Sequence, residues 1–401
     1  MCCNYNRKME AYSILIVGMY GIPSHIIRFI RNLKQTNPSA HISLFSERNK
    51  EEFSHEIGEY LDEYIQSVSC TKWPPLLRKL KKYYDRHVLA KQLRGIAKTR
   101  HYDIVNIHYP TYRLGYVMRY FRRMSNTIVV SPWGSDVLRV TNPQVKKILS
   151  RVFKFSDFIT VDSTGIFENV LCNEMKIEKA KFHPLVWGSE TIDYINEHLS
   201  EVSRAHAKEL LSLEGKYLIT CGYNAFEEQR HEIIINAINA IRNQLPNNMV
   251  LLFPLTYGSS SGTRKEEHVK KVKALCAELD LPAVFYERYL SISELFLLRR
   301  ATDMFIHIQP TDGGNSSLQE YVLCGSKVVH GAWIHYHYLE QYSPLFYYPI
   351  TDIKELGSVI LNAYHSEPIQ IPDEVMTFIR NRGWRAKMTL WNDFFISCLN
   401  K

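Results

Sequence analysis

The chain has 401 residues and a net charge of +8, and 45% of its residues are hydrophobic and 22% charged. This composition excludes a largely disordered chain, and the length favours two compact domains. No apolar run approaches the roughly 18 residues of a membrane-spanning helix, and the first residues lack the apolar core of a signal peptide. None of the eight cysteines forms a C-x-x-C pair, so neither a zinc site nor a disulfide framework is indicated. We therefore expect a cytoplasmic protein.

Short runs of β-branched and other apolar residues recur through the first half of the chain, separated by longer stretches with helical periodicity. The runs cover residues 13–18, 42–45, 104–107, 127–130 and 158–161. This alternation is typical of βα units in a parallel sheet, with a first helix over residues 24–34. It predicts a Rossmann-like domain over residues 10–187.

A second alternating series follows a charged segment over residues 188–214, which predicts a linker with helical character. The expected strands cover residues 216–221, 249–254, 283–287, 304–308 and 327–330. The expected helices cover residues 229–243, 264–279, 292–300 and 316–324, and Gly325 suits the left-handed position after the last of them. The second domain spans residues 215–401 and ends in helices. We expect an α/β protein of two Rossmann-like, doubly wound domains facing a cleft, with ligands at the carboxyl ends of the strands.

The segment after the expected strand 304–308 has the pattern of a phosphate-binding loop that leads into a helix. Two glycines permit close approach, and the free N–H groups of the helix start form a diphosphate cradle. The cradle residues are Gly313, Gly314, Asn315, Ser316 and Ser317. About one turn into the helix, Glu320 can accept both hydroxyls of a ribose. The alternative is a tight turn with an N-cap and two solvated carboxylates, Asp312 and Glu320.

The same segment resembles the E-x7-E motif of the retaining, nucleotide-sugar-dependent glycosyltransferases with the GT-B fold (group 1 glycosyltransferases). Asp312 stands for the first acid, Glu320 for the second and Gly325 for the later glycine, while Lys327 replaces the usual proline. The resemblance implies that Asp312 faces the donor sugar near the anomeric centre, although aspartate has a shorter reach than glutamate. It also implies that Glu320 holds the nucleotide ribose.

Residues 222–231 stand where this family carries its G-R-x4-K-G element, after a strand. The resemblance implies that Arg230 neutralises the leaving diphosphate, with Tyr223 in place of the first arginine and Asn224 beside it in the donor loop. One cation together with helix dipoles can stabilise a diphosphate. The alternative is that Arg230 is an exposed helix residue.

In the first domain, Val-Ser-Pro-Trp-Gly-Ser-Asp over residues 130–136 resembles the family's H-G-[ST]-D element, with Trp133 in place of histidine. Asp136 is then expected to contact the acceptor hydroxyl or to orient another residue, and the alternative is a turn or N-cap aspartate. His108 also follows a strand, but a lone histidine is more often structural. Gly18 and Gly21 fit a glycine loop near the sugar diphosphate.

A second, looser resemblance joins Phe-Pro-Leu-Thr-Tyr-Gly over residues 253–258 to the bacterial 4-acetamido-4,6-dideoxygalactose (Fuc4NAc) transferases. These enzymes also have a GT-B fold but invert the anomeric centre. The resemblance places Tyr257 over the donor. The paired acids favour retention and this segment favours inversion, and we expect retention.

A basic block covers residues 71–100, with ten lysines or arginines against one acid, Asp85. Interleaved apolar residues such as Trp73, Leu76 and Tyr83 suggest an amphipathic helix that lies on anionic lipid. Core packing of the apolar side, with a solvated basic side, is the alternative. Nucleic-acid binding is a third interpretation, but no nucleic-acid module accompanies it, so no such partner is expected.

Together these features predict a glycosyltransferase that moves a sugar from a nucleotide diphosphate donor to a hydroxyl. The expected acceptor is a lipid-linked saccharide at the inner face of the cell membrane, as in bacterial surface-polysaccharide synthesis. The expected catalytic residues are Asp312, Asp136 and Arg230. No metal is expected, because no D-x-D pair is present, and no cofactor is expected besides the donor substrate. The alternatives are an inactive sugar-nucleotide-binding partner protein and a nucleotide-sugar epimerase of the same fold.

Overall fold

The computed structural model describes residues 10–18, 23–47, 57–67, 78–162, 165, 167–258, 262–312, 314, 316–334 and 336–399. Within these ranges, the side chains of residues 23, 24, 78–82, 262–264 and 337 are not described. The chain forms two compact units. Unit 1 comprises Met1–Gly188 and Arg385–Lys401, and unit 2 comprises Ser189–Trp384.

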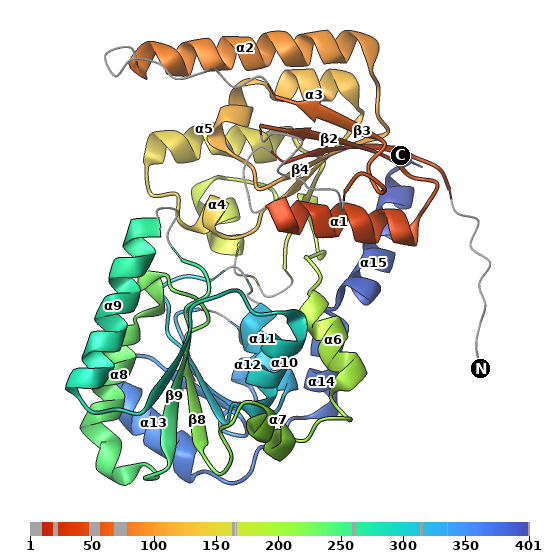
Figure 1. The fold of residues 1–401 in the computed structure, drawn as a ribbon. Helices are drawn as coiled ribbons and strands as arrows, with labels where there is room; N and C mark the ends of the chain where they lie inside the picture. The colour runs from red at the N-terminus through yellow and green to blue at the C-terminus, as the bar shows by residue number, and fades with distance from the viewer. Residues whose placement is uncertain are drawn as a thin grey trace, which may run out of the picture. The chain divides into compact units, whose positions relative to one another are not determined.

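Unit 1 is built on a seven-stranded parallel sheet with the order β3-β2-β1-β4-β5-β6-β7 (Figure 1). Its strands are β1 Ser13–Val17, β2 His41–Ser46, β3 Glu63–Gln66, β4 Ile104–His108, β5 Thr127–Ser131, β6 Phe158–Thr160 and β7 Phe182–His183. Its helices are α1 Pro23–Thr36, α2 Arg78–Thr99, α3 Met118–Met124, α4 Ser135–Leu138, α5 Pro143–Phe155 and α15 Trp384–Leu399. The five strands expected from the apolar runs are confirmed. Two were missed, since β3 is short and only partly buried and β7 has two residues.

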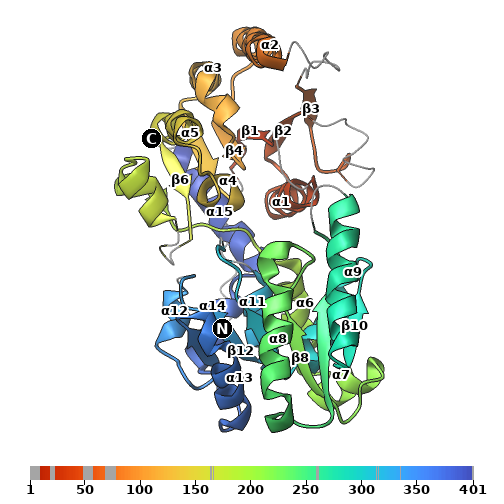
Figure 2. The same cartoon turned by 90° about the vertical axis from the view of Figure 1, so that its left-hand side faces the viewer.

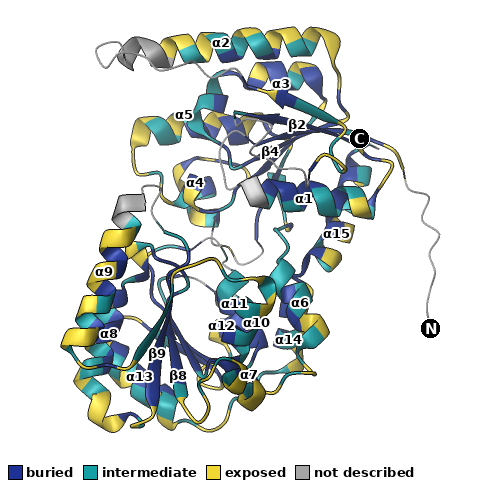
Figure 3. Ribbon diagram, viewed as in Figure 1, coloured by how far each residue is buried: buried dark blue, intermediate teal, exposed yellow. Residues whose placement is uncertain are grey.

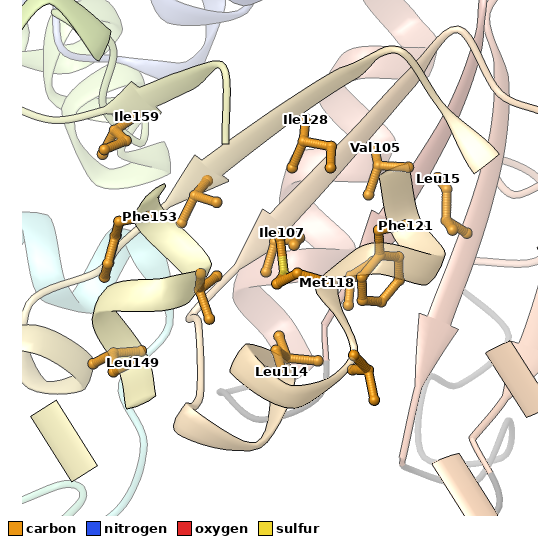
Figure 4. Packing of buried hydrophobic residues seen from close by; sticks show 14 of the residues in the cluster. Leu15, Val105, Ile107, Leu114, Met118, Phe121, Ile128, Leu149, Phe153 and Ile159 are labelled. Carbon is orange, nitrogen blue, oxygen red and sulfur yellow. The ribbon is translucent and has the colours of Figure 1, made fainter. Parts of the chain in front are cut away.

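Helices cover both faces of the unit 1 sheet, which explains why the residues of its central strands are buried on both sides. Helices α2, α3 and α5 pack on one face, and Figure 4 shows this core, where Val105 and Ile107 of β4 meet Met118 and Phe121 of α3. Asn142 caps α5, because its side chain accepts from the amides of Gln144 (2.9 Å) and Val145 (3.2 Å).

Unit 2 is built on a six-stranded parallel sheet with the order β10-β9-β8-β11-β12-β13. Its strands are β8 Tyr217–Cys221, β9 Met249–Pro254, β10 Ala283–Tyr286, β11 Met304–His307, β12 Lys327–Gly331 and β13 Tyr347–Ile350. Its helices are α6 Glu190–His198, α7 Arg204–Leu210, α8 His231–Ile241, α9 Gly262–Glu278, α10 Ile292–Ala301, α11 Ser316–Leu323, α12 His337–Glu340, α13 Leu356–His365 and α14 Asp373–Arg380. Helices α8, α9 and α13 lie on one face, and α6, α7, α10 and α11 lie on the other (Figures 1 and 2). All the strands and helices expected here are confirmed within a few residues.

The domain boundaries differ from the expectation in two ways. Residues 188–214 are not a separate linker, because α6 and α7 pack against α10 within unit 2. The end of the chain does not belong to the second domain, because α15 packs in unit 1, where Trp391 contacts Phe29 of α1 with ring centroids 5.1 Å apart. The many charged residues of α6 and α7 led to the prediction of a linker, although each helix has a buried side. The sequence of α15 does not indicate which of the two sheets the helix packs on.

In each unit the first strand lies in the middle of the sheet, and the strand order reverses beside it. In unit 2 the reversal lies between β8 and β11, which are hydrogen-bonded neighbours. The loops that leave the carboxyl ends of these two strands run to opposite faces, and the crevice between such loops is the usual ligand site of a doubly wound sheet.

Candidate functional site

The expected donor loops of unit 2 meet at the carboxyl ends of β8, β11 and β12. Gln309, two residues after β11, joins them. Its side-chain Oε1 accepts from Gln229 Nε2 of the β8 loop at 2.8 Å, and its carbonyl accepts from Trp333 Nε1 of the β12 loop at 2.8 Å. Tyr223 contributes a longer contact, from its hydroxyl to Gln309 Oε1 at 3.5 Å. Neither Gln309 nor Trp333 was among the site residues predicted from sequence, although Gln309 begins the segment that contains the glycine-rich loop.

The β8 loop is tightly folded around Gly222, which has a left-handed φ of +65°. A Cβ atom at this position would lie 2.8 Å from Gln229 Oε1 and 3.0 Å from His231 Nε2. Any other residue would therefore meet both backbone strain and a steric clash. The glycine lets the loop fold back so that Gln229 reaches Gln309.

Arg230 ends this loop and precedes α8, and its backbone is also left-handed, with φ +58° and ψ 39°. For a residue with a Cβ this conformation is costly, and such strain tends to persist at functional positions. The guanidinium lies over the Trp333 ring, 5.5 Å from its centroid. Arg230 is half-buried rather than fully exposed, so the structure does not match the alternative of an exposed helix residue.

Glu320 lies in α11 and is 3% exposed. Its Oε2 accepts from Arg299 Nε at 3.2 Å in a pair whose side chains are both 4% exposed, and its Oε1 accepts from Ser189 Oγ at 3.1 Å. The turn alternative required a solvated carboxylate at this position, and the buried Glu320 side chain does not match it. Each oxygen retains acceptor capacity beyond its one protein partner. Arg299 was missed, although an arginine in the apolar run Phe-Leu-Leu-Arg over residues 296–299 is a signal of a buried ion pair.

Asp312 is 8% exposed and belongs to a polar network behind the loop. Its Oδ2 lies 2.8 Å from His307 Nε2, on the last residue of β11, and accepts from the Tyr336 hydroxyl at 2.8 Å. Burial, followed by the negative charge of Asp312, holds the pKa of Tyr336 well above its usual value. The shorter aspartate suits this network, since a glutamate would extend one methylene further. The expected contact between Asp312 and a donor sugar stays a prediction.

The β9 loop, which carries Tyr257, packs directly on the β8 loop. The Ala225 amide donates to the Tyr257 carbonyl at 2.6 Å, and a Cβ on Gly258 would lie 3.0 Å from Ala225 Cβ. Asn224 is buried and its Oδ1 accepts from the Phe226 amide at 2.9 Å, so it shapes the loop. The Tyr257 ring lies nearly parallel to that of Tyr289, with centroids 6.3 Å apart.

The cradle itself is described only in part. Gly314 has a left-handed φ of +90°, and α11 begins at Ser316, followed by Ser317. Gly313 and Asn315 lie outside the described residues. The expected left-handed glycine after the helix is confirmed at Gly325, with φ +83°.

In unit 1, Asp136 lies in the first turn of α4 and is 6% exposed. Its Oδ1 accepts from the amides of Gly134 at 2.8 Å and Trp133 at 3.0 Å. These contacts match the turn aspartate weighed as the alternative. Burial raises the pKa of Asp136 from 3.8 to about 7, against the opposing effect of the amide hydrogen bonds.

This raised pKa predicts a pH-dependent effect of Asp136→Asn on stability. Between pH 4 and pH 7 the folded chain holds a proton that the unfolded chain has released, so this group stabilises the fold below about pH 4 and that contribution is lost as the pH rises through about 7. Asparagine does not titrate and its oxygen can accept the same two amides. The variant should therefore gain Tm relative to the wild type as the pH rises from 4 to 8. Thermal melts across this range check it, and a difference in Tm that is constant with pH would contradict it.

The remaining unit 1 candidates have structural surroundings. His108 is fully buried between Phe29 and Trp187, with ring centroids 4.7 and 4.8 Å away, and burial lowers its pKa to about 3. Gly18 follows β1, and a Cβ there would lie 2.2 Å from Ile26 Cδ1, so this glycine allows α1 to pack closely. Gly21 lies outside the described residues.

Comparison with known proteins supports the architecture. Residues 23–163 match the family model described as glycosyl transferase 4-like. No curated protein matches the chain by sequence. A glycosyltransferase from Rickettsia africae ESF-5 superposes with a TM-score of 0.67 at 13% identity, over 98% of this chain and 99% of that one. Anabaena Alr3699/HepE in complex with UDP and glucose superposes with a TM-score of 0.63 at 13% identity, over 97% of each chain. The apo form of the lipopolysaccharide outer core galactosyltransferase WaaB superposes with a TM-score of 0.63 at 14% identity, over 96% of this chain and 99% of that one.

The chain has the GT-B fold. The expected fold class of two Rossmann-like domains is therefore confirmed, whereas the roles of single residues stay predictions. The family match falls in unit 1 and includes residues 130–136, whereas the segments that resemble the E-x7-E and G-R-x4-K-G elements lie in unit 2.

The basic block has two different sides in this GT-B chain. Residues 71–77 lie outside the described residues, and the rest forms α2. Leu89 and Leu93 are buried in the unit 1 core, while Tyr83 is 67% exposed. Core packing therefore accounts for one side of the helix. No helix among the described residues is long and apolar enough to cross a membrane. The same part of the chain contains no cluster of three or more His, Cys, Asp or Glu side chains suited to a metal ion.

Proposed function

We propose that this protein is a glycosyltransferase that moves a sugar from a nucleotide diphosphate donor to an acceptor hydroxyl. One observation carries the proposal: the β8, β9 and β11 loops, which held the donor candidates from sequence, gather at the point of unit 2 where the strand order reverses, and the β12 loop joins them through Trp333. The GT-B fold supports it, and so does a solved structure of similar fold, Anabaena Alr3699/HepE, which is in complex with UDP and glucose.

In this proposal each group of the loop cluster has a separate task. Glu320 accepts the ribose hydroxyls through the acceptor capacity that Arg299 and Ser189 leave. Arg230 and the start of α11 stabilise the diphosphate as it leaves, where the charge develops. Asp312, held by His307 and Tyr336, lies near the anomeric carbon. The chemistry is transfer with retention, and it needs neither a metal nor a further cofactor.

The acceptor belongs to the same proposal. We propose a saccharide carried on a membrane lipid, in the synthesis of a bacterial surface polysaccharide, with the protein in the cytoplasm and peripheral at the inner face of the membrane. The basic α2 supports it, because cations near an anionic surface are attracted to it. The galactosyltransferase with the same fold acts on lipopolysaccharide outer core, according to its name.

A panel of nucleotide sugars tests the donor. A ligand at about 100 times its Kd adds about 2.7 kcal/mol of stability, so the true donor should raise Tm by several degrees. The best ligand is then incubated with the protein alone and with saccharide acceptors, and products are identified by mass spectrometry and by the coupling constant of the new anomeric proton. Absence of both stabilisation and product for every donor would overturn the proposal.

A second candidate is a protein that binds sugar nucleotides without catalysis. It is favoured by the contacts of Asp136 and Asp312, whose carboxylates are hydrogen-bonded within their own units, and by Trp133 in the position of the family's histidine. In that case the panel should give stabilisation without transfer or donor cleavage. An epimerase of the same fold would convert one nucleotide sugar into another with no acceptor present.

A further inference from the structure

A hollow on unit 1 is lined by aromatic and cationic side chains, and none of its lining residues belongs to the loops discussed above. Its volume is about 560 Å³, and its walls come from α2, the turn η3 (Tyr112–Tyr116), α3 and the end of α5. The side chains that matter are those of Tyr83, Arg86, His87, Tyr116, Arg119 and Phe155. The described residues that line it include arginines and a histidine but no acid, so the hollow suits an anion.

The two arginines of the hollow contact aromatic rings. Within the described part of the chain neither Arg86 nor Arg119 forms an ion pair. Arg86 lies over the Tyr116 ring, 4.5 Å from its centroid, and Arg119 donates to the Tyr120 hydroxyl at 2.9 Å. The one acid of α2, Asp85, instead faces Arg113, with Nη2 and Oδ2 3.9 Å apart. Each guanidinium has five N–H donors, so several remain for a phosphate.

Large aromatic side chains at the hollow remain in water. Tyr83 is 67% exposed and Phe155 is 47% exposed. The fold does not require this arrangement of α2, because Leu89 and Leu93 on its other side already anchor the helix in the core. Figure 3 shows α2 exposed along much of its length. Aromatic rings beside cations are typical of surfaces that enter the interfacial region of a membrane.

We propose that this hollow binds the phosphate-bearing headgroup of an anionic membrane lipid. Arg86 and Arg119 contact the phosphate, and Tyr83 and Phe155 enter the interface around it. A site for a soluble phosphorylated metabolite would bury its aromatic residues, whereas these are exposed. The inference deepens the proposed function and rests on it for the membrane-borne acceptor, but the binding itself can be measured without any transfer reaction.

The test compares binding of the full chain to vesicles of phosphatidylcholine alone and of phosphatidylcholine with phosphatidylglycerol. At low salt the wild type should sediment with the second kind only. Each lost cation should lower partition about fivefold, so Arg86→Gln with Arg119→Gln should lower it about 25-fold. Phe155→Ser should lower partition even at high salt, because its contribution is not electrostatic. The matched control is Lys270→Gln with Lys271→Gln, which removes the same charge from exposed positions of α9 in unit 2 and should leave partition unchanged.

Three outcomes would overturn the proposal. The first is equal partition of the arginine variant and the wild type, and the second is an equal loss in the control, which would indicate net charge alone. In the third, the arginine variant loses binding to glycerol phosphate or to an oligonucleotide but binds vesicles as the wild type does. Donor cleavage in solution separates this inference from the proposed function. It should be the same in the arginine variant as in the wild type, and a wild type that binds vesicles selectively but cleaves no donor would contradict the function and leave the lipid site standing.

Discussion

Glu320→Ala is expected to lower the free energy of unfolding by about 3–5 kcal/mol, the usual cost of removing one partner from a buried ion pair. The substitution leaves the Arg299 guanidinium, 4% exposed, without its carboxylate partner, and an unpaired buried charge is costly. It also removes the acceptor of Ser189 Oγ. Urea unfolding followed by circular dichroism measures the change.

A double variant separates the buried charge from other causes. Glu320→Leu combined with Arg299→Met removes both charges and should recover most of the stability, because an apolar pair of similar volume is often as stable as the ion pair. Glu168→Ala removes one partner of an exposed pair with Lys179 and should change stability little. Equal losses in the single and double variants would show that the ion pair does not dominate.

The ligand role of Glu320 needs a milder change. Glu320→Gln keeps the shape of the side chain, and if the carboxylate accepts ribose hydroxyls, the affinity for free nucleoside diphosphate should fall by about 1.5–3 kcal/mol. Ser189→Ala removes a protein partner of the same carboxylate and should largely preserve that affinity. Calorimetry on folded protein decides, and unchanged affinity in Glu320→Gln would exclude the ribose contact.

Arg230→Ala is expected to lower kcat about 100-fold, the scale for loss of one group that stabilises developing charge, and to change KM for the donor less. The physical reason is that the diphosphate gains negative charge as the glycosidic bond breaks, so the guanidinium binds the transition state more strongly than the donor. Steady-state kinetics with the donor identified by the panel measure both constants. A rise in KM alone would reduce Arg230 to a binding residue.

The left-handed backbone of Arg230 offers a matched control. Arg230→Gly removes the same guanidinium but relieves a strain of about 1–2 kcal/mol, so it should be more stable than Arg230→Ala and equally slow. Arg230→Lys keeps a point charge and should be the most active of the three. If activity followed stability across the series, the effect of Arg230 would be structural.

Local sequence was sufficient for much of the fold. The apolar runs predicted β1, β4, β5 and β8–β12 because parallel strands between two layers of helices are rich in apolar and β-branched residues. The edge strand β10 kept this pattern although it is only partly buried. Glycines and polar residues after the strands predicted the β8 and β11 loops, and Gly325 predicted the end of α11. These predictions succeed because backbone conformation at such points depends on a residue's own stereochemistry.

What the sequence by itself determined was therefore the alternation of strands and helices, two Rossmann-like domains and the loops that hold the candidate residues. The tertiary structure decided the partners. Arg299 and Glu320 are 21 residues apart in sequence, Asp312 meets Tyr336, and α15 returns to unit 1 after the whole of unit 2. A carboxylate has the same local signature whether it is solvated or buried against a cation, since burial and pairing depend on segments that the chain brings together only when it folds.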